Sequence, residues 1–288
     1  MRLVPYLQLL RLPAVFTAWA DILAAHLIAT GGDVRIVPLL LLLLSTACLY
    51  WAGMVLNDCF DLSIDRSERP ERPLPSERVP VRHAWLLGWA LLIAGVVAAG
   101  LVGARQLLIA VLIAGAVVAY DGWLKNHAVG PAAMGLCRYL NWLLGLSVVA
   151  LAPVSFVIAL PAFLYVAALT VLSRNEVNAD NRRAPALTAA GIAAAVVTIF
   201  ALLSGGTLPN PWILFPLALA VWFIFRELQR TWADFTPARI RMTVRQLILG
   251  IVVLDAILVV GAGYWWGALA VLALLLPGRL LSRLIPVT

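Results

Sequence analysis

A series of long apolar runs constrains this chain more strongly than any other feature. A helix needs about 20 mostly apolar residues to cross the hydrocarbon core of a bilayer, and ten runs in the sequence approach that length. Charged residues make up only 12% of the 288 positions, whereas a soluble domain carries about 25%. We therefore predict one all-α domain over residues 1–288, a polytopic membrane bundle of nine to ten transmembrane helices. The predicted spans are 13–30, 36–56, 83–103, 106–122, 131–151, 154–172, 185–204, 211–227, 244–263 and 265–281.

Two details of these spans remain open. The run 244–281 is either two helices joined at 261–267 or one helix followed by an interfacial segment. The first run has no small-residue cleavage site, so we expect it to be retained as a span rather than removed as a signal peptide.

The distribution of basic residues predicts the orientation of the bundle. If the N-terminus lies inside, all of the 21 Lys and Arg residues except Arg35, Arg105 and Arg138 fall in segments on the inner side. Such an excess of positive charge is typical of the cytoplasmic side. Topology thus explains the net charge of +7, and we expect no nucleic-acid partner. We expect an integral protein of a prokaryotic plasma membrane, with its N-terminus and its long loops in the cytoplasm.

The strongest local signal is an acidic segment at the inner end of the second predicted span. Asp58, Asp61 and Asp65 follow Asn57 with spacing i, i+3, i+7, which places the three carboxylates on one face of a helix. Clustered carboxylate oxygens suit hard cations such as Mg²⁺, which binds through a few carboxylates together with substrate phosphates. The alternative is an acidic helix end that pairs with nearby arginines, namely Arg66, Arg69 and Arg72.

A second acidic cluster follows the sixth predicted span on the same side. Glu176 and Asp180 repeat the spacing of Asp61 and Asp65, and Ser173 stands where the first cluster has Asp58. We interpret the two clusters as a weak internal repeat that could hold two Mg²⁺ around one diphosphate. The alternative is a surface loop of mixed charge.

Three further polar residues lie at or inside predicted spans. Lys125, the only lysine, follows the fourth span and is either a snorkelling anchor or a point charge that contacts phosphate. Arg138 and Asn141 share one face of the fifth span. Because charge inside a membrane is costly, they form either a substrate contact or a structural ion pair with Asp121 or Asp21.

Other residues within spans carry weaker signals. Asp21 is the best candidate for the acceptor side of a cavity, His26 is consistent with an ordinary hydrogen-bonded residue, and Asp255 has no identifiable partner. Some aromatic side chains near the acidic segment could stabilise a carbocation through their π faces. These are Phe60, Tyr120, Trp123, Tyr139 and Trp142.

Together these motifs resemble those of the UbiA superfamily of intramembrane prenyltransferases. Residues 57–65 match its N-D-x-x-D-x-x-x-D pattern, and 72–76 resemble its R-P-L-P-S segment. Tyr120 and Lys125 resemble its Y-x-x-x-K element with one extra residue, and Glu176 and Asp180 stand where a second D-x-x-x-D is usual. The segments 134–141 and 172–177 are more similar to the EboC-like branch.

The resemblance implies a helical bundle around a cavity and a Mg²⁺-dependent prenyltransferase. Mg²⁺ held by both acidic motifs would bind a prenyl diphosphate, Lys125 and Arg72 would contact its phosphates, and a small aromatic or lipid-like acceptor would be alkylated. Asn57, Tyr120, Arg138 and Asn141 would help to bind the substrates. Two rival interpretations remain: a catalytically weakened relative that binds or transports a prenylated or phosphorylated lipid, and a secondary transporter driven by buried charges.

Overall fold

The computed structural model describes residues 4–284 and confirms an all-helical chain over that range. Its elements are α1 (Val4–Leu9), η1 (Leu12–Ala14), α2 (Val15–Ala29), α3 (Ile36–Phe60), α4 (Leu62–Glu68), α5 (Val81–Gly100), α6 (Ala104–Gly122), η2 (Leu124–Asn126), α7 (Gly130–Leu146), α8 (Pro153–Ile158), α9 (Leu160–Ser173), α10 (Ala184–Ser204), η3 (Pro211–Ile213), α11 (Leu214–Ala233), α12 (Pro237–Gly261), α13 (Trp265–Ala273) and α14 (Leu275–Leu284).

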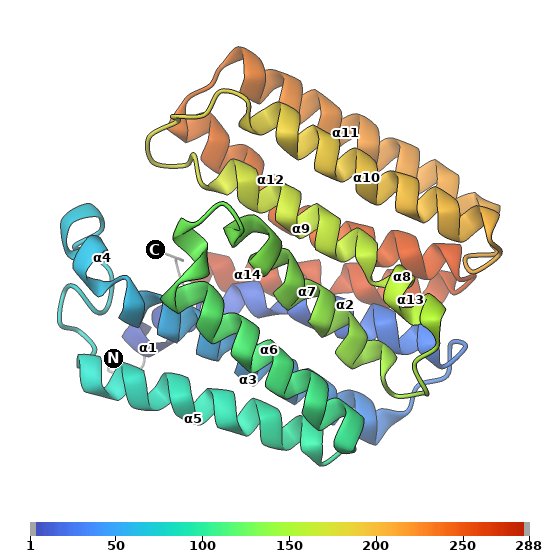
Figure 1. The fold of residues 1–288 in the computed structure, drawn as a ribbon, viewed down its shortest axis with the longest axis horizontal. Helices are drawn as coiled ribbons and strands as arrows, with labels where there is room; N and C mark the ends of the chain where they lie inside the picture. Colours follow the sequence, from blue (N-terminus) through green and yellow to red (C-terminus); the bar gives the residue numbers. More distant parts are fainter. Residues whose placement is uncertain (1–3, 285–288) are drawn as a thin grey trace.

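Nine helical segments within the described residues are long and apolar enough to cross a membrane. Helix α7 falls just short of that length with 17 residues, but it runs through the bundle between its neighbours (Figure 1). This agrees with the predicted nine to ten spans. Of the two alternatives for residues 244–281, the structure has two helical parts, because α12 ends at Gly261 and α13 begins at Trp265.

The first span differs from its predicted form. Helical structure begins at Val4, not near residue 13, and is interrupted at Arg11, whose backbone is left-handed with φ of 46° and ψ of 48°. The interruption separates α1 from η1 and α2. It also brings the Arg11 side chain to Asp58 at the end of α3, so the break has a consequence for the site described below.

Helix α2 lies at the centre of the packing and contacts α3, α7, α12 and α13. Helix α7 packs in turn against α2, α6 and α9. The approach of α7 to α2 depends on Gly145, because a Cβ at this position would lie 2.7 Å from the Cβ of Ala25. The close approach of α2 and α7 brings polar groups of α2, α3 and α7 within contact of one another inside the bundle.

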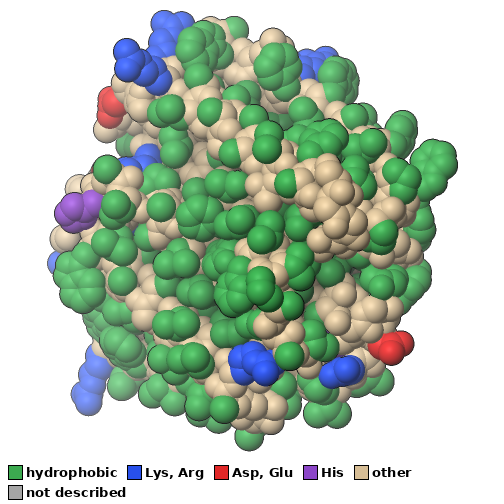
Figure 2. Space-filling view, turned by 45° about the vertical axis from the view of Figure 1, so that its right-hand side comes forward, with side chains coloured by type: hydrophobic (Ala, Val, Ile, Leu, Met, Phe, Trp, Pro, Cys, Tyr) green, Lys and Arg blue, Asp and Glu red, His purple; other side chains and the backbone are tan. Residues whose placement is uncertain are grey.

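The outer surface of the bundle is strongly apolar. Side chains such as Leu40, Ile93, Val197, Phe215 and Leu269 are 60–77% exposed. Figure 2 shows hydrophobic side chains over most of one face, with Lys and Arg near its margins. Without lipid such a surface would be exposed to water, and patches of this size on a protein mark an interaction surface. The chain is therefore an integral membrane protein.

The long connections gather at one end of the bundle. Figure 1 places α1, α4, the loop between α9 and α10 and the turn between α11 and α12 on the same side. We call this side the loop-rich end. The connections at the opposite end are mostly short, as the sequence predicts, and the acidic motifs lie at the loop-rich end.

Candidate active site

The first acidic segment lies where α3 ends at the loop-rich end. Helix α3 stops at Phe60, Asp61 is the residue between helices with φ of −88° and ψ of 3°, and α4 begins at Leu62. Helical hydrogen bonds nevertheless continue through this point, because the N–H groups of Asp61 and Asp65 donate to the carbonyls four residues before them. Asp58 and Asp65 share Arg72 as a partner, whereas Asp61 pairs with Lys125.

Each carboxylate of this segment pairs with a cation. Asp58 Oδ1 lies 3.0 Å from Arg11 Nη2 and 3.5 Å from Arg72 Nη1, and Asp65 Oδ2 lies 2.8 Å from Arg72 Nη1. Asp61 Oδ1 lies 2.6 Å from Lys125 Nζ. Three acids thus face three cations, which balances the charge of a largely buried cluster. We call these six side chains the charge cluster.

The loop after α4 places Arg72 in the charge cluster. Leu74 is buried with Leu9, Val55 and Val79 in a small core beneath the loop, and the backbone N–H of Ser76 donates to the carbonyl of Arg72. The side chain of Arg72 is only 7% exposed. Buried apolar side chains therefore hold this arginine against the acids, whereas Arg66 and Arg69, which the sequence also offered as partners, make no ion pair within residues 4–284.

The second acidic cluster has a different backbone from the first. Residues 174–180 form turns and irregular structure after α9, and Ala179 has a left-handed φ of 51°. Glu176 and Asp180 therefore do not lie on a helix, although their spacing repeats that of Asp61 and Asp65. Asp180 is exposed. Glu176 is half-buried, and burial raises the pKa of its carboxyl group against the opposing effects of Arg69, Arg241 and Arg11. Because Arg11 also pairs with Asp58, Glu176 lies near the charge cluster.

A cavity of about 270 Å³ leads from the charge cluster into the bundle between α2, α3, α6 and α7. Arg11, Asn57, Tyr120 and Asp121 line it toward the loop-rich end. The Asn57 side-chain amide donates to Asp121 at 3.0 Å. Farther along, the lining is mostly apolar and comes from the helix faces, including Leu49, Tyr50, Gly53, Met54, Ile113, Val117, Met134, Cys137 and Val166. The cavity thus joins a charged mouth to an apolar interior.

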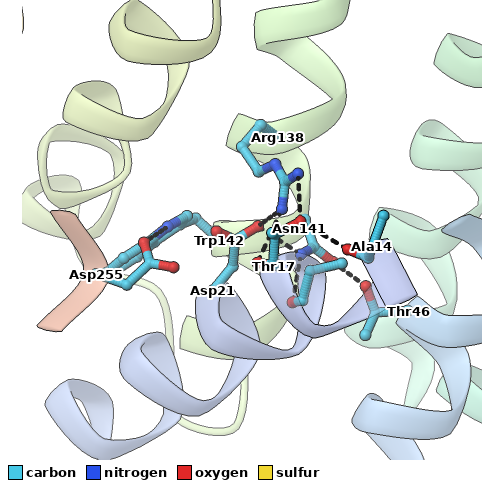
Figure 3. A network of polar contacts seen from close by, with 9 residues as sticks. Ala14, Thr17, Asp21, Thr46, Arg138, Asn141, Trp142 and Asp255 are labelled. Atoms are coloured by element: carbon cyan, nitrogen blue, oxygen red, sulfur yellow. Dashed lines mark hydrogen bonds and ion pairs between the residues drawn. The ribbon is translucent and has the colours of Figure 1, made fainter. Parts of the chain in front are cut away.

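The deep end of this cavity is polar again and belongs to a buried network (Figure 3). Arg138 Nη1 donates to Asp21 Oδ2 at 2.8 Å, and the Asn141 amide donates to the same oxygen at 2.8 Å. Thr46 donates to Asn141 Oδ1 at 2.6 Å. Of the two partners offered for Arg138 by the sequence, Asp21 is therefore correct. Thr46, Arg138 and Asn141 line the cavity, while Asp21 lies behind them.

A second cavity, larger at about 640 Å³, lies between α9, α10, α11 and α12. Its one acidic side chain, Glu227, pairs with Arg230 and Arg239. None of the predicted site residues lines it. The smaller cavity is therefore the candidate active site.

Comparison with known families agrees with this geometry. The model of the UbiA prenyltransferase family matches residues 15–243. Apart from Arg11, this range includes the charge cluster, the second acidic cluster and the polar residues of the cavity. The chain belongs to the UbiA prenyltransferase family. This family membership accounts for the order in which the first acidic motif, Arg72, Lys125 and the second motif occur.

Relatives of this UbiA family member include digeranylgeranylglyceryl phosphate synthases of archaea. That of Metallosphaera sedula is 31% identical over 125 residues, 43% of this chain and 44% of the relative. That of Sulfurisphaera tokodaii is 28% identical over 142 residues, 49% of this chain and 51% of the relative. The chain thus spans about half the length of these curated relatives.

Solved structures share the fold at low identity. A structure from a study of digeranylgeranylglyceryl phosphate synthase in membranes has a TM-score of 0.70 at 22% identity, covering 91% of this chain and 98% of that chain. A UbiA homologue from Aeropyrum pernix has a TM-score of 0.66 at 18% identity, covering 94% and 98%. A homologue from Archaeoglobus fulgidus, bound to DMAPP and Mg²⁺, has a TM-score of 0.54 at 18% identity, covering 93% and 99%.

The charge cluster is chemically suited to Mg²⁺ and diphosphate together. In the part of the chain that the structure describes, no three acidic, thiol or imidazole groups converge as a ready metal centre, because the acids pair with cations. Their oxygens are nevertheless the hard ligands that Mg²⁺ prefers. Arg72 Nε is buried and has no hydrogen-bond partner among residues 4–284, so this guanidinium retains a donor for a phosphate oxygen. The residues fit an exchange of partners, in which the ion pairs open, the carboxylates bind Mg²⁺ and the cationic side chains bind the phosphates.

Sequence reasoning missed two members of the site and misplaced most of the aromatic ones. Arg11 gave no motif signal, and Asp121 was considered only as a partner of Arg138. Of the aromatic candidates, Tyr120 lines the cavity. Phe60 packs edge-on against Trp85, Tyr139 packs against Phe163, Trp123 is 67% exposed, and Trp142 donates to Asp255 at 3.2 Å. Tyr50, which no motif singled out, also lines the cavity.

Proposed function

We propose that this protein transfers a prenyl group, in a Mg²⁺-dependent reaction within the membrane, from a prenyl diphosphate to a small aromatic or lipid-like acceptor. The observation that supports this most directly is the charge cluster, which opens onto a cavity with an apolar interior. A charged mouth suits the diphosphate, and an apolar interior suits the hydrocarbon of the same molecule. The names of the relatives and the bound DMAPP and Mg²⁺ of the A. fulgidus homologue point the same way.

The acidic residues would hold the metal. These are Asp58, Asp61, Asp65, Glu176 and Asp180. When bound, Mg²⁺ supplies positive charge that neutralises the departing diphosphate. Lys125 and Arg72, released from Asp61 and Asp65, would donate to phosphate oxygens, since cationic donors at developing negative charge lower the barrier. Asn57 orients Asp121 at the cavity mouth through its amide.

The apolar walls have a role of their own. They exclude water from the allylic carbon as its bond to oxygen breaks, so that the acceptor rather than water is alkylated. Tyr50 and Tyr120 line the cavity, and an aromatic ring turned toward the allylic carbon would stabilise positive charge through its quadrupole. Because the basic residues favour a cytoplasmic loop-rich end, the donor would enter from the cytoplasm, and the protein would reside in a prokaryotic plasma membrane.

The test is release of inorganic diphosphate by the purified protein in nanodiscs. Dimethylallyl, geranyl, farnesyl and geranylgeranyl diphosphates are supplied with Mg²⁺ and with a lipid and metabolite extract as the source of acceptor. We expect Mg²⁺-dependent release with at least one donor, lost in Asp61→Asn and retained in Asp33→Asn, an exposed carboxylate in the connection between α2 and α3.

Two other outcomes decide against this function. Donor binding without release in the presence of a complete extract would favour capture or transport of a phosphorylated lipid. Equal release by wild type and Asp61→Asn would contradict the assignment of the metal ligands.

A further inference from the structure

Arg138 holds a charge far from either membrane surface. It lies eight residues after Gly130, the first residue of α7, which corresponds to about 12 Å along the helix axis. The hydrocarbon core is about 30 Å thick, so the side chain lies near its middle. An ionisable side chain at this depth is costly and by default marks a functional site.

Arg138 keeps hydrogen-bond donors that face the cavity. Its contacts in the described structure are the Thr17 carbonyl at 3.0 Å, Asp21 Oδ2 at 2.8 Å and Thr17 Oγ1 at 3.3 Å. A guanidinium has five N–H donors, so donors remain after these contacts, and Arg138 lines the cavity. Tyr50, two turns before Asn57 along α3, lines the same cavity.

The group of charges around Arg138 is neutral overall. Asp21 and Asp255 belong to the same buried network around α7, because Arg138 and Asn141 donate to Asp21 and the neighbouring Trp142 donates to Asp255. Both are fully buried, and one oxygen of each, Asp21 Oδ1 and Asp255 Oδ2, lacks any partner within the described residues. Arg138 is the one cation of this network within the described residues, and burial of an unbalanced carboxylate is strongly unfavourable, so one of the two carboxyl groups holds a proton. The group then consists of one guanidinium, one carboxylate and one carboxylic acid.

We propose that the deep end of the cavity binds the prenyl acceptor through an uncharged oxygen, a hydroxyl or a carbonyl, which accepts hydrogen bonds from Arg138. Asn141 and Thr46 complete the polar wall on either side of this position. This inference rests on the proposed prenyl transfer, for which it names the class of acceptor.

The neutral group explains the selectivity for an uncharged oxygen. A carboxylate or phosphate placed here would be buried without a net counter-charge, because Asp21 already neutralises Arg138, and burial of an uncompensated charge is strongly unfavourable. An uncharged oxygen takes the free N–H donors without this penalty. Any anionic part of the acceptor would therefore lie toward the mouth of the cavity, near Arg11.

The experiment compares two isosteric probes, benzamide and benzoate, at pH 7. Their affinities are measured by ligand-observed saturation-transfer NMR with the full-length protein in phosphatidylcholine nanodiscs, and empty nanodiscs correct for partition into lipid. We expect benzamide to bind the wild type about tenfold or more tightly than benzoate. Equal or tighter binding of benzoate overturns the proposal, and this result needs no variant.

Variants of the two aspartates test the cause of the selectivity. Asp21→Asn and Asp255→Asn each leave one carboxylate to balance Arg138, so the preference for benzamide is retained in both. The double variant leaves Arg138 unbalanced, and we expect its preference to shift toward benzoate by about tenfold or more. An unchanged ratio in a folded double variant overturns the charge argument.

Binding of a prenyl diphosphate with Mg²⁺, measured in the same samples, reports on folding and on the donor site separately. If the donor does not bind to the wild type, the proposed function fails. The preference for benzamide over benzoate is measured by binding alone, without any turnover, so it is decided separately. Loss of donor binding in a variant identifies misfolding and excludes that variant, and the wild-type ratio still decides the inference.

Discussion

The Nζ atom of Lys125 lies 2.6 Å from Oδ1 of Asp61, and this contact joins the turn after α6 to the break between α3 and α4. The side chain of Lys125 is 13% exposed, so it points into the site rather than to the membrane surface as a snorkelling anchor would. Lysine carries three N–H donors, and Asp61 is its one ion-pair partner among residues 4–284. The remaining donors are available for a phosphate.

Replacement of this lysine should weaken the use of the donor. A hydrogen bond to a charged group contributes about 1.5–3 kcal/mol, so Lys125→Gln should lower kcat/KM for the prenyl diphosphate by about 10- to 100-fold. Donor titrations of diphosphate release measure the effect. Arg174→Gln, which alters a nearby exposed arginine that donates to the backbone carbonyls of Asn126 and His127, serves as the control. A wild-type kcat/KM in Lys125→Gln would show that Lys125 does not contact the phosphates.

Loss of Arg72 should destabilise the protein in a way that Mg²⁺ partly reverses. Arg72→Met leaves Asp65 without its partner and Asp58 with only Arg11. Removing one member of a buried ion pair costs about 3–5 kcal/mol, so the Tm in detergent should fall clearly. Without Arg72, the freed carboxylates can serve as metal ligands. Mg²⁺ at about 10 mM, which occupies sites of millimolar affinity, should therefore raise the Tm of Arg72→Met more than that of the wild type. Equal responses of the two proteins to Mg²⁺ would contradict the exchange model.

Mg²⁺ and diphosphate should bind together to the wild type. The charge cluster pairs three acids with three cations, so either ligand alone adds its full charge, whereas each offsets most of the other's charge when both bind. A ligand at 100 times its Kd stabilises a protein by about 2.7 kcal/mol. We expect inorganic pyrophosphate with Mg²⁺ to raise the Tm by more than the sum of the two separate effects. The matched control is Asp61→Asn, in which we expect the Tm shifts caused by the two ligands simply to add. Additive Tm shifts in the wild type would be evidence against coupled binding.

The contact between α2 and α7 should tolerate no side chain at Gly145. A Cβ there would lie 2.7 Å from the Cβ of Ala25 and 3.0 Å from the carbonyl oxygen of Ile22. Overpacking of this kind costs about 1–3 kcal/mol, so Gly145→Ala should lower the Tm. Gly115→Ala on α6 is the control, because a Cβ there meets nothing within 4 Å. A similar Tm for both variants would mean that α2 and α7 can separate without cost.

The sequence alone determined the class of fold and the location of the first acidic motif. The hydrophobic effect and the length of a helix act locally, so the apolar runs were sufficient to predict the spans and the loop-rich end. The spacing of Asp58, Asp61 and Asp65 and the following Arg72 were sufficient to predict a site that holds carboxylates and an arginine together. Local composition did not reveal the break at Asp61 or the irregular turn around Glu176 and Asp180.

Only the tertiary structure decided which charges meet. Arg11 reaches Asp58 across 47 residues of sequence, and Arg138 reaches Asp21 across 117. Spacing along the chain cannot specify such contacts, because they depend on how α2, α3 and α7 pack and on the left-handed backbone of Arg11. In a low-dielectric interior each buried charge requires a partner. The sequence could therefore require that Arg138 be paired, while the packing of α2 against α7 selected Asp21 over Asp121.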